Sequence, residues 1–415
     1  MLQYVKSHFI VKEVISMVTL DKIYHASFVL KDLIRKTDMI YAPKINPDCE
    51  VYLKTENLQV TGSFKVRGAA YKISQLSADD KAKGVIACSA GNHAQGVALA
   101  ATKSGIKSLI CLPDGAPISK VEATKSYGAD ICLVEGVYDD AYNKALQLRD
   151  EKGYTFVHPF DDDDVIAGQG TIGLEILDQL KDVDAVVVPI GGGGLISGVS
   201  FAIKALNPNV KIYGVQAKGA PSMYNSIKDD KIERLDNVST IADGIAVKEP
   251  GENTFEYVKK YVDEIVTVSD DEIATAILAL IEQQKLVTEG AGAVSVAAVM
   301  FNKIDVKGKK IVCLVSGGNI DVTILSRVIK RGLMKSGRLC NLVIELMDKP
   351  GQLQNVSRII AECGGNVTGV HYEKGNTESV NGCFLRIEME TRDHEHVQYI
   401  TKTLRDAGFK IIEGI

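Results

Sequence analysis

Up to about residue 330, apolar residues gather in short, continuous runs rich in β-branched side chains, and these runs alternate with stretches of helical spacing. The runs predict buried strands at residues 51–54, 85–88, 108–112, 131–134, 185–188, 212–215 and 311–315. Helical spacing predicts helices at residues 19–34, 94–103, 120–127, 139–151, 173–180 and 270–284. Apolar strands separated by helices indicate parallel sheets covered on both faces, so an α/β body is expected.

The pattern changes after Arg331. Residues 332–338 carry no long apolar period and predict a linker. The remainder alternates as strand, helix, strand, strand, helix and strand, at residues 340–347, 352–363, 366–373, 382–391, 393–407 and 409–413. This βαββαβ order is typical of the ferredoxin-like fold. We therefore expect an N-terminal extension at residues 1–16, with Met17 as an alternative start, a body at 17–331, and a separate domain at 339–415.

Composition narrows the class of protein. A chain of 415 residues is too long for one hydrophobic core, which supports several domains. A net charge of −5 without a basic stripe argues against nucleic-acid binding, and no apolar run is long enough to cross a membrane. The eight cysteines show no CxxC spacing, and no export signal is recognisable, so we expect a cytoplasmic protein with core cysteines and neither disulfides nor a zinc site.

A single lysine stands out in the stretch Thr61–Gly68, which follows the first predicted strand. In water the amine of Lys65 is protonated and a poor nucleophile, because a lysine has a pKa of roughly 10.4. In a desolvated pocket it becomes able to form a Schiff base with a carbonyl group, including that of pyridoxal phosphate. A lysine in the first turn of an ordinary surface helix remains the alternative.

Four loops directly follow predicted strands, where ligands gather in parallel α/β sheets. Residues 89–96 (SAGNHAQG) are suited to bind a carboxylate at a helix start, although Ser89 or Asn92 as a simple helix cap is the alternative. Residues 189–198 (PIGGGGLISG) let backbone N–H groups approach a phosphate, and neither the glycine spacing nor Gln216 after the next strand suits a dinucleotide. The loop at 316–319 (SGGN) offers a hydroxyl, and the loop at 242–247, which contains Asp243, has no assigned chemistry.

Taken together, the SFKVRG stretch, the SAGNHAQG loop, the tetraglycine loop and the late SGGN resemble one family over residues 19–330. The chain resembles the fold-type II pyridoxal phosphate enzymes, and most closely the threonine dehydratases (threonine ammonia-lyases). The resemblance implies two parallel-sheet subdomains as in tryptophan synthase β, with a small subdomain at about 61–155 inserted in the large one. The segment DKPGQL at residues 348–353 makes the C-terminal unit resemble an ACT domain, a regulatory module that often binds amino acids.

The resemblance implies a role for each motif. Lys65 would carry pyridoxal phosphate as a Schiff base with Phe64 beside the ring, Asn92 would bind the ring hydroxyl, and Ser316 would face the ring nitrogen. Lys65 and Ser89 are the expected catalytic residues. The phosphate would be wrapped by Gly191, Gly192, Gly193, Gly194 and Leu195, and the substrate carboxylate would be held by Ser89, Gly91, Asn92 and His93.

Other expectations concern metals, effectors and assembly. Relatives with a divalent metal carry an acidic residue where this chain has Gln216, so no metal ligands are expected, although a monovalent cation stays open. A branched-chain amino acid, isoleucine before valine, is expected near Gly351, Leu353 and Asn366 at a paired ACT interface, unless that unit serves assembly alone. A homo-oligomer, either a dimer or a tetramer, is expected. Serine dehydratase, serine racemase, an NAD-dependent dehydrogenase and a silent amino-acid sensor remain alternatives.

Overall fold

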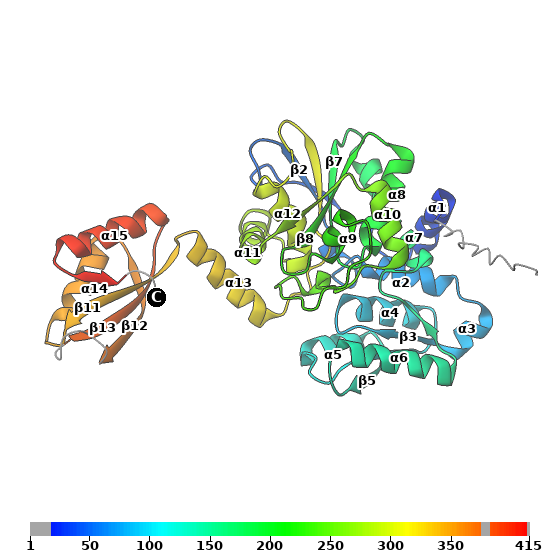
Figure 1. Cartoon of the computed structure of the whole chain (residues 1–415), viewed down its shortest axis with the longest axis horizontal. Coiled ribbons are helices and arrows are strands. Elements are labelled where there is room, and N and C mark those ends of the chain that lie inside the picture. The colour runs from blue at the N-terminus through cyan, green and yellow to red at the C-terminus, as the bar shows by residue number, and fades with distance from the viewer. Residues whose placement is uncertain (1–17, 375–381, 413–415) are drawn as a thin grey trace, which may run out of the picture. The chain divides into compact units, whose positions relative to one another are not determined.

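The computed structural model describes residues 18–374 and 382–412 (Figure 1). The expected extension at residues 1–16 and the end of the last predicted strand at Glu413 lie outside these ranges. The chain divides into two compact units. The first runs to Ala276 and includes Leu280–Asn319, and the second comprises Ile277–Ala279 and the residues from Ile320 onward. Within the described residues, no helix is both long enough and apolar enough to span a bilayer.

The larger sheet of the first unit has six strands in the order β1-β2-β10-β7-β8-β9. Their bounds are β1 Met39–Tyr41, β2 Glu50–Lys54, β10 Lys310–Leu314, β7 Ala185–Pro189, β8 Lys211–Ala217 and β9 Glu264–Val268. Only β1 runs antiparallel to its neighbour, and the other pairs are parallel. The central strand β7 is buried along its whole length, as its continuous apolar run predicts.

A second, four-stranded sheet has the order β5-β4-β3-β6 and is parallel throughout. Its strands are β5 Asp130–Val134, β4 Ser108–Pro113, β3 Val85–Cys88 and β6 Thr155–Phe156. All four lie in or directly beside the range expected for the small subdomain. The prediction of two parallel-sheet subdomains in an α/β body is confirmed.

The helices of the first unit cover the two sheets (Figure 1). They are α1 Leu20–Leu30, α2 Lys65–Ser74, α3 Ala78–Lys83, α4 Asn92–Lys103, α5 Ile118–Ser126, α6 Tyr138–Lys152, α7 Asp163–Gln179, α8 Gly194–Leu206, α9 Ser222–Lys228, α10 Glu252–Tyr261, α11 Asp270–Ala279 and α12 Gly290–Met300. Short helical turns occur at Glu56–Leu58, Asp243–Ile245 and Leu280–Gln284. Helix α7 begins ten residues before the predicted start at residue 173, because the carboxylate of Asp162 caps it by accepting from the N–H groups of Asp164 and Val165.

The second unit begins with helix α13, and the elements after it have the predicted ferredoxin-like order. Its elements are α13 Val322–Lys335, β11 Leu339–Met347, α14 Gln352–Glu362, β12 Asn366–Lys374, β13 Gly382–Glu390, α15 His394–Asp406 and β14 Lys410–Ile412, and the antiparallel sheet has the order β12-β13-β11-β14. The expected linker at 332–338 needs a correction, since α13 continues to Lys335. Its buried positions Val328 and Gly332 lie four residues apart, so the same helix face extends one turn further than expected.

Candidate active site

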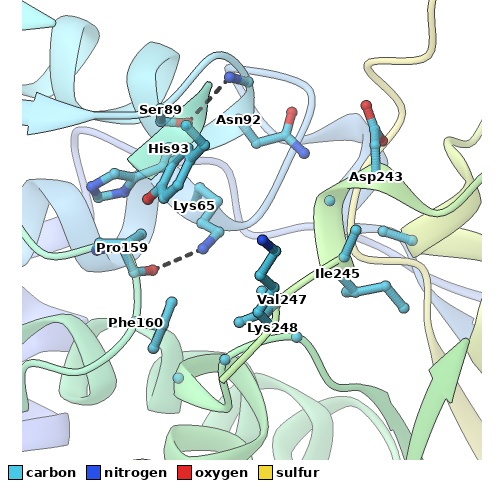
Figure 2. Close-up of a pocket in the computed structure, with 18 of the residues that line it drawn as sticks. Lys65, Ser89, Asn92, His93, Pro159, Phe160, Asp243, Ile245, Val247 and Lys248 are labelled. Atoms are coloured by element: carbon cyan, nitrogen blue, oxygen red, sulfur yellow. Dashed lines mark hydrogen bonds between the residues drawn. The ribbon is translucent and has the colours of Figure 1, made fainter. Parts of the chain in front are cut away.

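The first unit contains a cavity of about 860 Å³ at the carboxyl ends of its parallel strands. All four loops singled out in the sequence contribute to its lining, together with Phe64 and Lys65. Figure 2 shows Lys65 facing this space between Ser89, Asn92 and His93 on one side and Phe160 and Asp243–Lys248 on the others. The structure therefore brings together segments that lie up to about 250 residues apart in the chain, as the strand-end argument predicts.

Lys65 is the first residue of α2, and this half-buried residue lines the cavity. Backbone hydrogen bonds hold the preceding segment against the loop after β10: Phe64 N donates to Ser316 O at 3.1 Å, and Gly318 N donates to Gly62 O at 2.8 Å. The Lys65 Nζ donates to the carbonyl oxygen of Pro159 at 2.8 Å. Burial lowers the pKa of Lys65 to about 8, and the nearby Glu289 opposes that shift. Lys65 thus lies in the first turn of a helix, as the alternative expects, and it also lines the cavity.

The loop from Ser89 leads into α4, and its small residues leave the helix start open to the cavity. Gly91 occupies the N-cap position without a side-chain cap, and the Ser89 hydroxyl accepts from the N–H of Gly91 at 3.1 Å. Neither Ser89 nor Asn92 caps the helix, so that alternative is wrong. The first N–H groups of α4 lack intrahelical acceptors, and such groups favour an anion.

His93 lines the same cavity, but its ring is already engaged. Burial lowers the pKa of His93 to about 3, so the imidazole is neutral at physiological pH. Its Nε2 lies 2.8 Å from the carbonyl oxygen of Val157. Because a carbonyl only accepts, Nε2 carries the ring proton and donates it. The ring is thus a structural element, and the backbone N–H of His93 is what the residue can offer to a carboxylate.

The four glycines after β7 form a tight turn at the start of α8. A Cβ on Gly192 would lie 2.5 Å from the Phe160 ring, and Gly193 has a φ of +104°, which strongly favours glycine. Packing against Phe160 therefore explains part of this glycine run without any ligand. The residues from Gly191 to Leu195 nevertheless all line the cavity, so a second helix start, that of α8, lies there, and helix starts favour anions.

A hydrogen-bond network connects three of the cavity-lining segments. Asn319 Nδ2 donates to Asn92 Oδ1 at 2.9 Å, and Asn92 Nδ2 donates to Glu289 Oε1 at 2.7 Å. The Ser316 hydroxyl lies nearby and donates to Ala291 O at 3.3 Å. Sequence reasoning missed Glu289. The available signal was a carboxylate directly before the long apolar run of α12, where a charged side chain becomes buried.

The loop at 242–247 has a charge contact that the sequence did not reveal. Asp243 pairs with Lys120 of α5 at 2.6 Å, and this ion pair joins the two subdomains beside the cavity. Asp243 is 60% exposed, so the pair itself contributes only about 0–1 kcal/mol to stability. Its position beside the cavity gives it an electrostatic effect on the groups inside.

Gln216, where the sequence predicts no metal ligand, is fully buried. Its side chain forms hydrogen bonds with backbone groups. Its Nε2 donates to Ile190 O at 3.4 Å, and its Oε1 accepts from Tyr224 N at 2.8 Å. Across the part of the chain that the structure describes, no group of three His, Cys, Asp or Glu residues is arranged to hold a metal ion.

The three residues expected at an effector site fall in two places. Gly351, with a φ of +88°, precedes α14, and Leu353 lies in the first turn of that helix. Asn366 follows the other end of α14 and donates from Nδ2 to Glu390 at 2.9 Å. An eleven-residue helix spans about 16 Å, so one chain does not bring Gly351 and Asn366 into one site.

The donor set of the cavity fits pyridoxal phosphate. It provides one amine of lowered pKa for an aldehyde, a helix start for a phosphate, and an aromatic side chain, Phe64, adjacent to that amine. A second helix start, at α4, remains for the carboxylate of an amino acid. A volume of about 860 Å³ has room for the cofactor and a small substrate.

Comparison with known proteins agrees with this fit. The family model for pyridoxal-phosphate-dependent enzymes matches residues 30–317. An L-threonine ammonia-lyase of Thermotoga maritima is 51% identical over 398 residues, which cover 95% of this chain and 99% of the relative. Another, from Geobacter sulfurreducens, is 44% identical and covers 92% of this chain and 96% of the relative.

Solved structures give the same result. The processed form of threonine deaminase isoform 2 from Solanum lycopersicum superimposes with a TM-score of 0.71 at 38% identity, covering 76% of this chain and 94% of that one. Maize serine racemase superimposes with a TM-score of 0.72 at 35% identity, covering 77% and 98%. The chain therefore belongs to the family of pyridoxal-phosphate-dependent enzymes.

Proposed function

We propose that the protein is an L-threonine ammonia-lyase that converts L-threonine to 2-oxobutanoate and ammonia, with L-serine as a secondary substrate. The observation that carries the proposal is the buried amine of Lys65 in a cavity that also contains two helix starts, at α4 and α8. The relatives that are similar over nearly the whole chain are described as L-threonine ammonia-lyases, which supports threonine over serine. One water leaves from the β-hydroxyl and one enters during hydrolysis, so the reaction consumes no net water.

When bound, pyridoxal phosphate supplies an aldehyde for Schiff-base formation and a conjugated ring that spreads negative charge from the α-carbon of the substrate. The N–H groups of Gly191–Leu195 are proposed to bind its phosphate, and Asn92 its ring hydroxyl. The Ser316 hydroxyl is proposed to face the ring nitrogen. Being neutral, it does not hold a proton there as a carboxylate partner would, which favours elimination over transamination.

The residues around Lys65 are proposed to perform the remaining tasks. The N–H groups at the start of α4, from Gly91 to His93, together with Ser89, bind the substrate carboxylate and orient the α-carbon toward Lys65. Lys65 Nζ takes the α-proton, and its pKa of about 8 suits a base that works near neutral pH.

Product analysis tests the proposed activity. The purified protein loaded with cofactor is expected to release 2-oxobutanoate from L-threonine, with a kcat/KM at least tenfold higher than that for pyruvate release from L-serine. Addition of NAD should change neither rate. Release of no keto acid from either substrate would contradict the lyase proposal and favour a sensor, while NAD-dependent oxidation would favour a dehydrogenase.

Serine racemase is the second candidate, because maize serine racemase is structurally similar over the first unit. The same reaction mixtures distinguish the two functions when they are analysed for D-serine. A racemase would accumulate D-serine from L-serine with little pyruvate, whereas the proposed lyase forms pyruvate and no more than traces of D-serine.

We also propose that residues 339–415 form an ACT regulatory domain behind a short linker, and that isoleucine, or more weakly valine, lowers the activity by binding there. The carboxylate of the effector would meet the start of α14 at Gly351, next to Leu353. Since Asn366 lies at the other end of α14, it would have to come from a second copy of the chain, which fits the expected homo-oligomer.

Calorimetry and activity measurements test the effector proposal. Isoleucine is expected to bind and to reduce the rate of threonine turnover severalfold, with valine weaker and AMP inactive. Leu353→Asp should weaken isoleucine binding at least tenfold, because it puts a like charge beside the effector carboxylate. Gln354→Asp, which adds the same charge at the next exposed position, is the matched control. No binding heat and no change in rate would leave assembly as the role of the domain.

A further inference from the structure

Glu289 has a buried carboxyl group that does not cap the helix it precedes. It occupies the N-cap position of α12, but its side chain makes no capping hydrogen bond. The residue is only 5% exposed, and the carboxyl lies in the wall of the cavity. Burying an ionisable group costs several kcal/mol unless it gains partners, so a side chain that turns away from its own helix indicates another use.

Two glycine-containing loops make room for this carboxyl. A Cβ on Gly317 would lie 2.4 Å from Glu289 Oε1, and a Cβ on Gly244 would lie 3.3 Å from the same oxygen. The backbone is fixed as well, because Glu289 N donates to Gly317 O at 3.1 Å. The loops at 242–247 and 316–319 thus enclose one carboxyl oxygen, and among the described side chains its donor is Asn92 Nδ2, at 2.7 Å.

The remaining hydrogen bonds of Asn92 specify the orientation of its amide. Asn92 Oδ1 accepts from Asn319 Nδ2, and Asn319 also donates to Thr61 O at 2.7 Å. With the oxygen of Asn92 held by Asn319 and one amide hydrogen held by Glu289, the second amide hydrogen is left for the cavity. Without Glu289, the amide of Asn92 would be held by Asn319 alone, and its orientation would be less firmly fixed.

We propose that Glu289 is a positioning residue that holds the amide of Asn92 toward the bound cofactor, and that protonation of Glu289 loosens this hold and changes the electronic state of the cofactor. The inference rests on the proposed contact between Asn92 and the cofactor ring. A carboxylate accepts a shorter and stronger hydrogen bond than a carboxylic acid, so the ionised form of Glu289 orients Asn92 more firmly.

The surroundings bring this titration close to neutral pH. Burial raises the pKa of Glu289 to about 7, and the charge of Asp243 adds to the increase. The hydrogen bond from Asn92 and the positive charges of Lys120 and Lys65 act in the opposite direction. These groups come from α4, α5, α2 and the Asp243–Ile245 turn, which are the described elements whose polar groups act on Glu289.

Absorption spectra of the cofactor-loaded protein, recorded against pH without substrate, test the proposal. The wild-type spectrum is expected to change with a midpoint near pH 7, and Glu289→Gln should lack that transition. Asp243→Asn should shift the midpoint to lower pH, because it removes a negative charge and leaves Lys120 unpaired. Asp139→Asn, which changes another carboxylate of the cavity lining, should keep the wild-type midpoint.

Cofactor affinity provides a second measurement. Glu289→Ala should weaken cofactor binding at least tenfold, whereas Glu289→Gln, which keeps an acceptor oxygen, should recover much of the loss. A Glu289→Gln protein that titrates like the wild type would overturn the proposal. Should that variant fail to bind the cofactor, an unshifted midpoint in Asp243→Asn would overturn it equally. Because no substrate is present, a failure to turn over threonine would affect the proposed function and not these titrations.

Discussion

Replacement of Lys65 by alanine is expected to remove the yellow absorption band of the bound cofactor and to lower kcat for keto-acid release by at least about 10³-fold. Lys65 lines the cavity beside Pro159, and its Nζ donates to the carbonyl oxygen of that residue (Figure 2). Lys120 and Lys248 also contribute to the cavity lining, but the amine of Lys120 is paired with Asp243. Loss of Lys65 therefore removes both the covalent attachment of the cofactor and the proposed base.

Lys72→Ala is the matched control, since Lys72 lies on the same helix but pairs with Asp162 and Asp164. It should keep the absorption band. For the cofactor-free wild type, the rate of cofactor capture should rise with pH and reach half its maximum at about pH 8, because only the neutral amine attacks an aldehyde and the pKa of Lys65 is about 8. A Lys65→Ala protein that retains the band would contradict the assignment.

Arg67→Met is expected to cost about 3–5 kcal/mol of folding free energy, although Arg67 touches neither the cavity nor the surface. Its guanidinium is fully buried and donates to Glu56 at 2.8 Å and to Glu175 at 2.7 Å, and Lys54 pairs with Glu175 at 2.6 Å. Removing Arg67 leaves the fully buried carboxylate of Glu56 without its ion-pair partner, while Glu175 keeps Lys54. Urea unfolding followed by circular dichroism measures the loss.

The double variant Arg67→Met with Glu56→Gln should recover part of this loss, because it removes a carboxylate left without its partner. Despite burial, Arg67 holds the pKa of Glu56 below its usual range. That contribution to stability is present above the pKa of Glu56 in the unfolded chain and is lost as the pH falls. The stability difference between wild type and Arg67→Met should therefore shrink in acid. A difference independent of pH would contradict the pairing.

The ion pairs of Arg67 also explain why the stretch Thr61–Gly68 contains an arginine. Arg67 lies two residues after Lys65 in the first turn of α2, and its bonds join that turn to Glu56 after β2 and to Glu175 on α7. The start of α2 is thus held from the side opposite to the cavity. Sequence reasoning identified the lysine from the chemistry of amines, but the partners of Arg67 lie 11 and 108 residues away.

The sequence alone was sufficient to predict those helices and strands whose apolar pattern lies within one short segment. The run 85–88 coincides with β3, and the run 185–188 differs from β7 by one residue, because a strand buried on both faces has to be continuously apolar. The ferredoxin-like order of the second unit followed from the same kind of pattern. Weakly apolar edge strands such as β1 and β9 were missed, since exposure at a sheet edge removes the apolar signal.

The sequence by itself also determined which loops meet, because parallel strands place their carboxyl ends at one edge of a sheet. Only the tertiary structure decided what the polar side chains do there. It buried Glu289 against Asn92, paired Asp243 with Lys120, and turned the ring of His93 toward a carbonyl oxygen. Those outcomes depend on distances between segments far apart in the chain and on the loss of solvent around each group. The residue types of a single segment determine neither these distances nor this loss of solvent.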